Sequence, residues 1–303
     1  MKLPFCFLPI DKAAGWSSHD CVAKIRNQLK GIVPRKTKVG HTGTLDPFAS
    51  GLLLVAIGKA TRFSDAVHLY NKTYEAEITL GKETTTLDTE GESVREMPVP
   101  EITREQLDAC QRVFTGRIEQ VPPAFSAKRI KGVRSYKLAR EKRAVDLKPI
   151  CVDIESIELA QVSEERIHCR VTCSTGTYIR TLGSDIAQFL GTVGHVSRLR
   201  RTSIGPIHVE RAFQIDGDLL FHQQCQAHAL SVSRVLPDFP EIELPFLFQE
   251  DLLQGRKIDV PGKRFPAVFL GVLSKDGVIR SVFKCQYDSR TRSILPKMLC
   301  YKA

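Results

Sequence analysis

Residues 38–62 read KVGHTGTLDPFASGLLLVAIGKATR, and this stretch says more about the fold than any other part of the 303-residue chain. It crowds His41 and Asp46 into a turn punctuated by glycines, and Pro47 stops the chain from continuing there as a helix. The apolar run Leu52–Ile57 follows and predicts a buried strand. A carboxylate on a rigid loop before a buried element suits a nucleophile or a general base. The same residues also fit a plain turn or a helix cap, and residue types alone leave both interpretations open.

The regions around this stretch alternate between helical and strand patterns. Apolar residues at helical spacing predict helices at 17–30, 104–114 and 178–190. Alternating runs predict strands at 73–80, 150–159 and 166–174. Two strand-like runs joined by Asp276-Gly277 predict a hairpin at 267–285. Prolines at 237, 240 and 245 interrupt any regular element between the predicted helix at 178–190 and this hairpin. The pattern predicts an α+β fold with a large domain over 1–245 and a small β-rich domain over 246–303.

The chain is basic, with 44 Lys and Arg against 34 Asp and Glu. Residues 248–303 hold 11 of the Lys and Arg against five Asp and Glu. A second basic cluster lies in 126–148, where the candidate RNA-binding residues are Lys128, Arg129, Lys131, Arg134, Lys137 and Arg140. Such clusters suit an anionic partner, of which nucleic acid is the commonest. The second cluster also fits a solvated helical face.

Several function classes are disfavoured by the sequence. Gly58-Lys59 is followed by Ala60 and lacks the glycine five residues earlier, so a phosphate-binding P-loop is excluded. Cys169 and Cys173 on one strand would lie about 13 Å apart, too far to share a zinc ion. No apolar run approaches the ~20 residues of a membrane span. Nine cysteines, an odd number in a long chain, indicate reduced thiols and a cytoplasmic location.

Three further segments add aromatic and guanidinium side chains. They read KTYEA (72–76), STGTYIR (174–180) and HVSRLRR (195–201). An aromatic face can stack an extruded base, and an arginine can pair with a carboxylate or a phosphate. Each residue also has a plainer interpretation: Tyr74 and Tyr178 as half-buried core side chains, and Arg180 as a surface ion pair.

Taken together, GHTGTLDPFASGLL, KTYEA, GTYIR and HVSRLRR, in this order and at these separations, resemble the bacterial tRNA pseudouridine synthase B (TruB) family. DKAAGWSS (11–18) is similar to its first motif, with Ala13 where the family usually has proline. Residues 122–140 resemble its RNA-gripping insertion, placed here at about 120–148. The resemblance is close over 7–215 and loose in the tail. It implies the pseudouridine synthase fold, with a mixed or antiparallel central sheet in a catalytic domain over 1–245 and a PUA-like RNA-binding domain over 246–303.

The resemblance also implies a function. The chain would isomerise uridine 55 in the T-loop of tRNA to pseudouridine by flipping the base, without metal or cofactor, as a cytoplasmic monomer that needs no protein partner. Two alternatives stay open: a tRNA-binding folding chaperone, and a uridine isomerase directed to ribosomal RNA or by a guide RNA. Asp46 corresponds to the catalytic aspartate. The residues that correspond to substrate-binding positions are Lys12, His41, Tyr74, Tyr178, Arg180 and Leu199. Attack on C1′, addition to the uracil ring and a glycal route remain equally compatible with the sequence.

Overall fold

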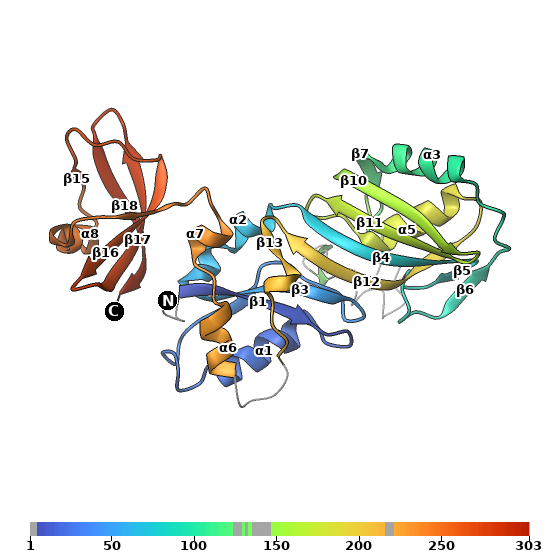
Figure 1. Ribbon diagram of the computed structural model, residues 1–303, viewed down its shortest axis with the longest axis horizontal. Helices are drawn as coiled ribbons and strands as arrows, with labels where there is room; N and C mark the ends of the chain where they lie inside the picture. The colour runs from blue at the N-terminus through green and yellow to red at the C-terminus, as the bar shows by residue number, and fades with distance from the viewer. Residues whose placement is uncertain (1–4, 124–128, 131–132, 135–146, 216–220, 303) are drawn as a thin grey trace.

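The computed structural model describes residues 5–123, 129–130, 133–134, 147–215 and 221–302. Figure 1 shows a long curved sheet with helices packed on it, and a smaller sheet of C-terminal residues at one end. The predicted α+β fold with a β-rich C-terminal region is therefore confirmed.

The large sheet has nine strands. In spatial order they are β1 (Phe5–Lys12), β3 (Ser50–Gly58), β12 (Gly194–Ile204), β4 (Lys72–Leu80), β11 (Arg166–Cys173), β10 (Ile150–Ser163) and β7 (Gly116–Gln120), with β2 (Val39–His41) beside β3 and β13 (Ile207–His208) beside β12. Every pairing is antiparallel except that of β3 with β12. The sheet is thus mixed, as the resemblance implied.

The parallel contact between β3 and β12 is unusually tight at Gly51. This residue lies opposite Arg201. Its φ is +104°, a conformation that side chains rarely adopt, and a Cβ there would collide with the backbone of Arg201. Only glycine fits, and it stands where the chain leaves the Asp46 loop and enters β3. The contact between Gly51 and Arg201 therefore fixes the point at which the Asp46 loop enters β3.

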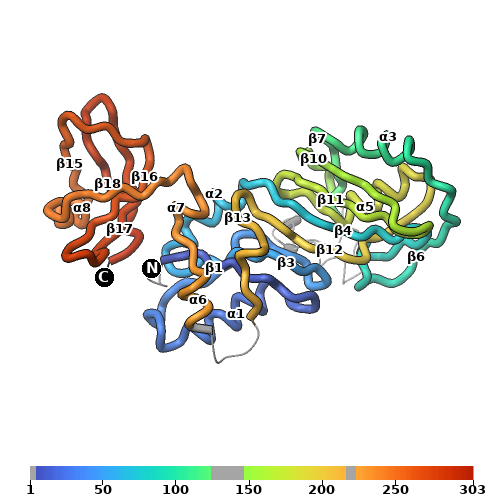
Figure 2. The backbone as a smooth tube through the Cα atoms, in the orientation of Figure 1, coloured from blue at the N-terminus to red at the C-terminus, as the bar shows by residue number. Residues whose placement is uncertain are grey.

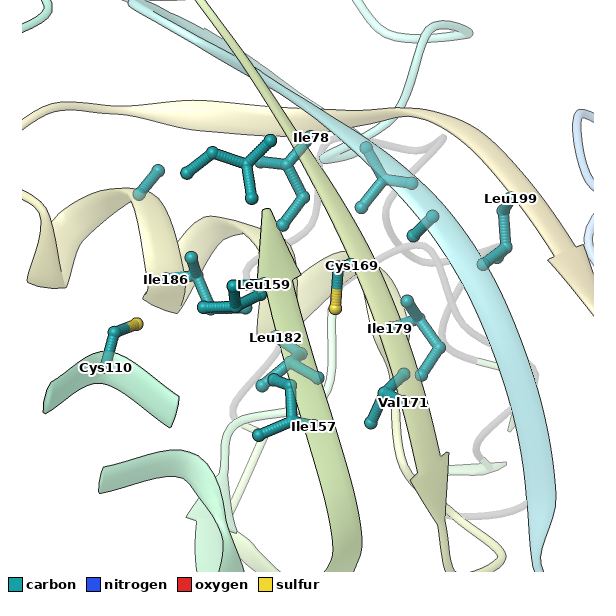
Figure 3. Close-up of a cluster of buried hydrophobic side chains, with 14 of the residues drawn as sticks. Ile78, Cys110, Ile157, Leu159, Cys169, Val171, Ile179, Leu182, Ile186 and Leu199 are labelled. Carbon is teal, nitrogen blue, oxygen red and sulfur yellow. The ribbon is translucent and has the colours of Figure 1, made fainter. Parts of the chain in front are cut away.

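Three amphipathic helices cover the large sheet: α1 (Ser18–Gln28), α3 (Arg104–Phe114) and α5 (Ile179–Phe189). Capping boxes fix the starts of α1 and α3, through Ser17 with Asp20 and Thr103 with Gln106. Figure 3 shows Leu182 of α5 pointing toward the buried side chains of β10 and β11.

Two thiols of the large sheet, those of Cys169 and Cys173, belong to this core. Each residue is 1% exposed. Burial raises the pKa of Cys169 to about 12 and that of Cys173 to about 11, so both stay protonated at neutral pH.

The smaller sheet has five strands. They are β14 (Glu241–Glu243), β16 (Val268–Lys275), β17 (Val278–Asp288), β18 (Ser293–Lys302) and β15 (Ile258–Asp259). The predicted hairpin is present, with Asp276 and Gly277 both at positive φ. Because β14 pairs with β16, the sheet takes in residues from 241 onward.

Short elements connect these parts. They are η1 (Lys59–Phe63), α2 (Ser64–His68), β5 (Lys82–Thr84), β6 (Ser93–Glu96), β8 (Arg129–Ile130), β9 (Val133–Arg134), η2 (Val209–Arg211), α6 (Phe221–His228), α7 (Val232–Val235), η3 (Phe246–Phe248) and α8 (Gln249–Leu253). In Figure 2 the chain passes from α7 into the smaller sheet, which lies next to the start of β1.

The smaller sheet packs against η1 of the larger body. The rings of Phe63 and Phe239 meet edge to face at 5.5 Å, and the Lys284 ammonium lies 5.1 Å from the centre of the Phe239 ring. Lys59 donates to the carbonyl oxygen of Leu299 at 2.7 Å. Apolar side chains of both parts share one buried cluster.

Candidate active site

The loop between β2 and β3 carries Asp46 and is held by hydrogen bonds from several directions. The Thr42 amide donates to Leu54 of β3 at 3.0 Å. Ser18, the first residue of α1, both accepts from the Leu45 amide at 2.8 Å and donates to the Leu45 carbonyl at 2.9 Å. These bonds fix the backbone on the N-terminal side of Asp46.

Lys12, at the end of β1, fixes the other side of this loop. Its ammonium donates to the carbonyls of Trp16 at 2.6 Å, Pro47 at 3.3 Å and Ala49 at 2.5 Å, and also to that of Ala13. Lys12 is only 1% exposed, and this burial lowers its pKa. The lysine expected to bind substrate thus lies in a cage of backbone carbonyls beneath the loop.

Arg201 of β12 supports the beginning of the same loop. Its Nε donates to Leu52 at 2.7 Å, and its two Nη atoms donate to Thr44 and Gly43 at 3.2 Å each. Arg201 is 1% exposed. Sequence reasoning missed this role. The available signal was the pair Arg200-Arg201 on a strand, because neighbouring strand residues point to opposite faces and one of the two must face inward.

Lys12→Met is expected to lower the free energy of unfolding by about 2–4 kcal/mol and to slow turnover roughly ten-fold. Methionine removes the lysine donor from the buried carbonyl of Ala49 and leaves the Pro47 carbonyl with the Gly15 amide alone, so the loop loses its anchor. Thermal unfolding and steady-state kinetics check this. Lys59→Met, which loses an exposed lysine–carbonyl bond, is the control and should cost less than 1 kcal/mol. If Lys12→Met weakened RNA binding with unchanged stability, Lys12 would contact RNA directly.

The centre of the site is an arginine shared between two carboxylates. Arg180 Nε lies 2.9 Å from Asp46 Oδ2, and its Nη1 lies 3.2 Å from Asp88 Oδ2. Nη1 also donates to the Thr86 carbonyl at 3.0 Å. The side chains of Arg180 and Asp88 are 7% and 3% exposed, whereas that of Asp46 is 35% exposed. Asp46 is therefore held on one side and open to a ligand on the other.

Asp88 is a site residue that sequence reasoning did not find. It lies in the loop between β5 and β6, and the Glu90 amide and the Thr86 hydroxyl both donate to its carboxylate. Its segment, ETTTLDTEGE, has the polar composition of an ordinary surface loop. Only the fold shows that this loop turns inward, through a hydrogen bond from Val196 of β12 to Leu87 at 3.0 Å.

Tyr74 and Leu199 lie on neighbouring strands beside this centre. Tyr74 on β4 is paired with Arg201 on β12, and Leu199 is paired with Ala76. Both side chains pack on the core of the large sheet, and Figure 3 labels Leu199 among them. Burial raises the pKa of the Tyr74 hydroxyl, and the Arg201 guanidinium opposes this rise. The Tyr74 hydroxyl is therefore protonated at neutral pH.

Tyr178 and His41 occupy the edges of the site. Tyr178 is the half-buried residue before α5, and its amide donates to Gln120 at 3.1 Å. His41 ends β2, and its Nδ1 is buried with no hydrogen-bond partner among the described residues. Burial and the charge of Arg201 lower the pKa of His41, so its ring is neutral at neutral pH. A neutral ring with an unpaired nitrogen is suited to contact a ligand.

His68, the last residue of α2, joins the two loops that supply Asp46 and Tyr178. Its Nδ1 lies 3.3 Å from the Thr42 carbonyl, and its Nε2 lies 3.0 Å from the Thr175 hydroxyl. With Nδ1 as the donor, Nε2 accepts from Thr175. No sequence motif pointed to this link, because His68 lies outside all of the motifs described above.

The predicted RNA-binding cluster is only partly described. Lys128, Lys131, Lys137 and Arg140 lie outside the described residues. Arg129 and Arg134 are paired partners in the β8–β9 hairpin, described at the level of the backbone.

Within the described ranges, no three His, Cys, Asp or Glu side chains gather in a way that could hold a metal ion. A search of the same residues finds no helix with the length and apolar character that crossing a membrane requires.

Comparisons with known proteins show the family of this chain. Residues 30–179 match the model of the TruB family pseudouridylate synthase N-terminal domain, and residues 180–230 match that of the tRNA pseudouridylate synthase B C-terminal domain. A curated tRNA pseudouridine synthase B from Halalkalibacterium halodurans is 35% identical over 300 residues, covering 96% of each protein. The chain belongs to the TruB family. The resemblance seen in the sequence is thereby confirmed.

Other TruB relatives are also similar. The tRNA pseudouridine synthase B of Thermobifida fusca is 43% identical over 68% of this chain and 72% of its own length. That of Ralstonia pickettii is 39% identical over 83% and 79%. Among solved structures, a Cbf5-Nop10-Gar1 complex has a chain that matches with a TM-score of 0.68 at 22% identity, covering 100% of this chain and 87% of that one. This likeness confirms the pseudouridine synthase fold.

Proposed function

We propose that this TruB-family chain isomerises uridine 55 in the T-loop of tRNA to pseudouridine, with Asp46 as the catalytic residue. The observation that carries the proposal is the ion pair between Asp46 and Arg180, which orients a carboxylate whose other side is open. Relatives that are 35–43% identical are named tRNA pseudouridine synthase B, which supports tRNA as the substrate.

The reaction makes clear demands on such a site. The C1′–N1 bond of uridine breaks, a C1′–C5 bond forms, the C5 proton leaves and N1 gains a proton. Asp46 can act as the nucleophile or the base in these steps, and Arg180 holds its carboxylate in one orientation. The reaction needs no electrons from outside, so the protein's own groups suffice for it.

The residues around Asp46 fit the handling of a detached base. Tyr74 offers an aromatic side chain on which uracil can stack while it turns, and Leu199 adds an apolar wall that excludes water from the detached sugar. Tyr178 borders the same pocket in this proposal. His41, neutral and with an unpaired Nδ1, would contact the extruded nucleotide or its neighbour.

Recognition would rest on charge and shape. The basic insertion, including Lys128 to Arg140, and the C-terminal β-rich domain, proposed as PUA-like, would grip phosphates of the T-arm and the stem beyond it. The enzyme would act as a cytoplasmic monomer without an obligate protein partner.

No observation favours either alternative function. A tRNA chaperone would have no use for the Asp46–Arg180–Asp88 arrangement. The matching chain of the Cbf5-Nop10-Gar1 complex is 22% identical to this one, and this likeness shows the fold alone.

Release of tritium tests the proposal, because only C5 of the isomerised uridine loses its hydrogen. The protein is expected to release about one equivalent of tritium from an unmodified tRNA transcript carrying 5-tritiated uridine. A transcript with cytidine at position 55 should release none. Release from ribosomal RNA fragments, with none from tRNA, would contradict the proposal.

A further inference from the structure

Trp16 is the only tryptophan of the chain, and its loop is bonded directly to the Asp46 loop. The Gly15 amide donates to the Pro47 carbonyl at 2.8 Å, and Lys12 Nζ bridges the Trp16 and Ala49 carbonyls. On the C-terminal side of Trp16, Ser18 forms two hydrogen bonds with the backbone of Leu45, as described above. The backbone of Trp16 is therefore positioned relative to Asp46 by bonds on both sides.

The ring of Trp16 is not used by the core. It is 36% exposed, among the larger apolar side chains that the protein leaves in solvent. The ammonium of Lys24, two turns into α1, lies 5.5 Å from the ring centre. An exposed indole is a surface on which a base can stack, and the Lys24 ammonium over the ring can contact a phosphate.

Basic residues follow Trp16 along α1 and in the loop after it. Residues 17–38 hold six Lys and Arg and one acidic residue, Asp20. The basic side chains are Lys24, Arg26, Lys30, Arg35, Lys36 and Lys38. All but Lys24 are exposed. Asp20 is engaged in the capping box of α1, with Ser17 donating to it at 2.6 Å. Within the part of the chain that the structure describes, no carboxylate forms an ion pair with these six cations.

In the sequence these cations are distinct from the two basic segments at 126–148 and 248–303. Figure 1 shows α1 packed beside β1 and β3, at a distance from the C-terminal sheet. Six cations on one short segment, none of them in an ion pair with a described carboxylate, suit a polyanion rather than a protein surface of mixed charge.

We propose that Trp16 and the basic side chains of residues 17–38 form an additional RNA contact of the enzyme. A base or ribose of the tRNA arm stacks on Trp16, and neighbouring phosphates contact Lys24 and the cations of the 30–38 loop. This inference rests on the proposed function. Because the Trp16 and Asp46 loops are bonded together, a nucleotide seated on Trp16 would set the position of the flipped uridine relative to Asp46.

The single tryptophan gives a direct test. A T-arm hairpin RNA is added to the Asp46→Asn variant, so that binding occurs without turnover. Tryptophan emission is expected to change saturably, with the same midpoint as RNA retention on a filter. Retention of RNA with unchanged emission would overturn the contact, even if the wild-type protein isomerises tRNA normally. A change in emission of the variant, together with a wild-type protein that releases no tritium from tRNA, would support the contact while contradicting the proposed function.

Variants separate stacking from charge. Trp16→Leu is expected to raise KM for tRNA roughly ten-fold with little change in kcat, and Trp16→Phe to recover most of the loss because phenylalanine still stacks. Lys30→Gln, Arg35→Gln and Lys36→Gln together should make the dependence of log affinity on log salt shallower by about two to three, near 0.7–0.9 per phosphate contact. Arg112→Gln, which removes an exposed charge from α3, is the control. A control effect about one third as large as that of the triple variant would show that only net charge matters and would overturn the proposal.

Discussion

Asp46→Asn is expected to leave the protein folded and to reduce tritium release from tRNA by at least about 10⁴-fold. Asparagine keeps the size of the side chain and an oxygen that can accept from Arg180 Nε. It carries no charge, so it is a poor nucleophile and a poor base. The side chain of Asp46 is 35% exposed, so the substitution should change the free energy of unfolding little. Single-turnover release from tritiated transcript, with thermal unfolding alongside, measures both effects.

Asp65→Asn is the matched control for this experiment, because it makes the same change at an exposed aspartate in the first turn of α2. It should keep nearly full activity. Filter binding should show that Asp46→Asn retains its affinity for the T-arm, since the loss lies in the chemical step. An Asp46→Asn variant that kept more than about a hundredth of the turnover would exclude a carboxylate mechanism at this residue. Unimpaired tRNA refolding by the inactive variant would show a chaperone activity that is independent of the chemistry.

Local sequence signals predicted the secondary structure well where the ends of an element are marked by the chain itself. The helix over 104–114 was predicted with the bounds of α3, because Thr103 caps its start and Gly116 follows its end. The strand predicted over 150–159 continues to Ser163 as β10. The four extra residues are exposed, and what holds them in the strand is pairing with β11. Such pairing depends on a neighbour in space, which a local pattern does not contain.

The residues of the site also fall into two groups, those that a local motif revealed and those that only tertiary contacts reveal. Asp46 and Arg180 stand in motifs of unusual composition, and the structure brings them to 2.9 Å. Asp88 pairs with Arg180 and Arg201 supports the Asp46 loop, but both roles were missed. Asp88 sits in a polar loop that only tertiary contacts turn inward, and Arg201 is a buried cation whose partners are backbone carbonyls. Every residue has a backbone carbonyl, so the residue types do not show which carbonyl an arginine or lysine will bind.

Arg180→Lys is expected to lower turnover by about 10²–10³-fold, although the charge is kept. The guanidinium contacts Asp46 through Nε while Nη1 contacts Asp88 and the Thr86 carbonyl. A lysine ammonium is a single point charge and cannot reach all three positions at once. Asp46 would therefore lose its fixed orientation, and the loss should appear in kcat more than in KM for tRNA.

Arg180→Met is expected to lower the stability of the protein as well as its activity. It leaves Asp88, 3% exposed, without its cation, and removing one partner of a buried pair costs about 3–5 kcal/mol. Adding Asp88→Asn removes that unpaired charge and should recover most of the stability, whereas activity should stay lost because Asp46 remains unsupported. Arg200→Met breaks the more exposed pair with Asp11 and should cost about 1 kcal/mol or less. Recovery of activity together with stability in the double variant would mean that Arg180 acts only by holding the fold. Recovery of stability alone would mean that it orients the carboxylate on which the reaction depends.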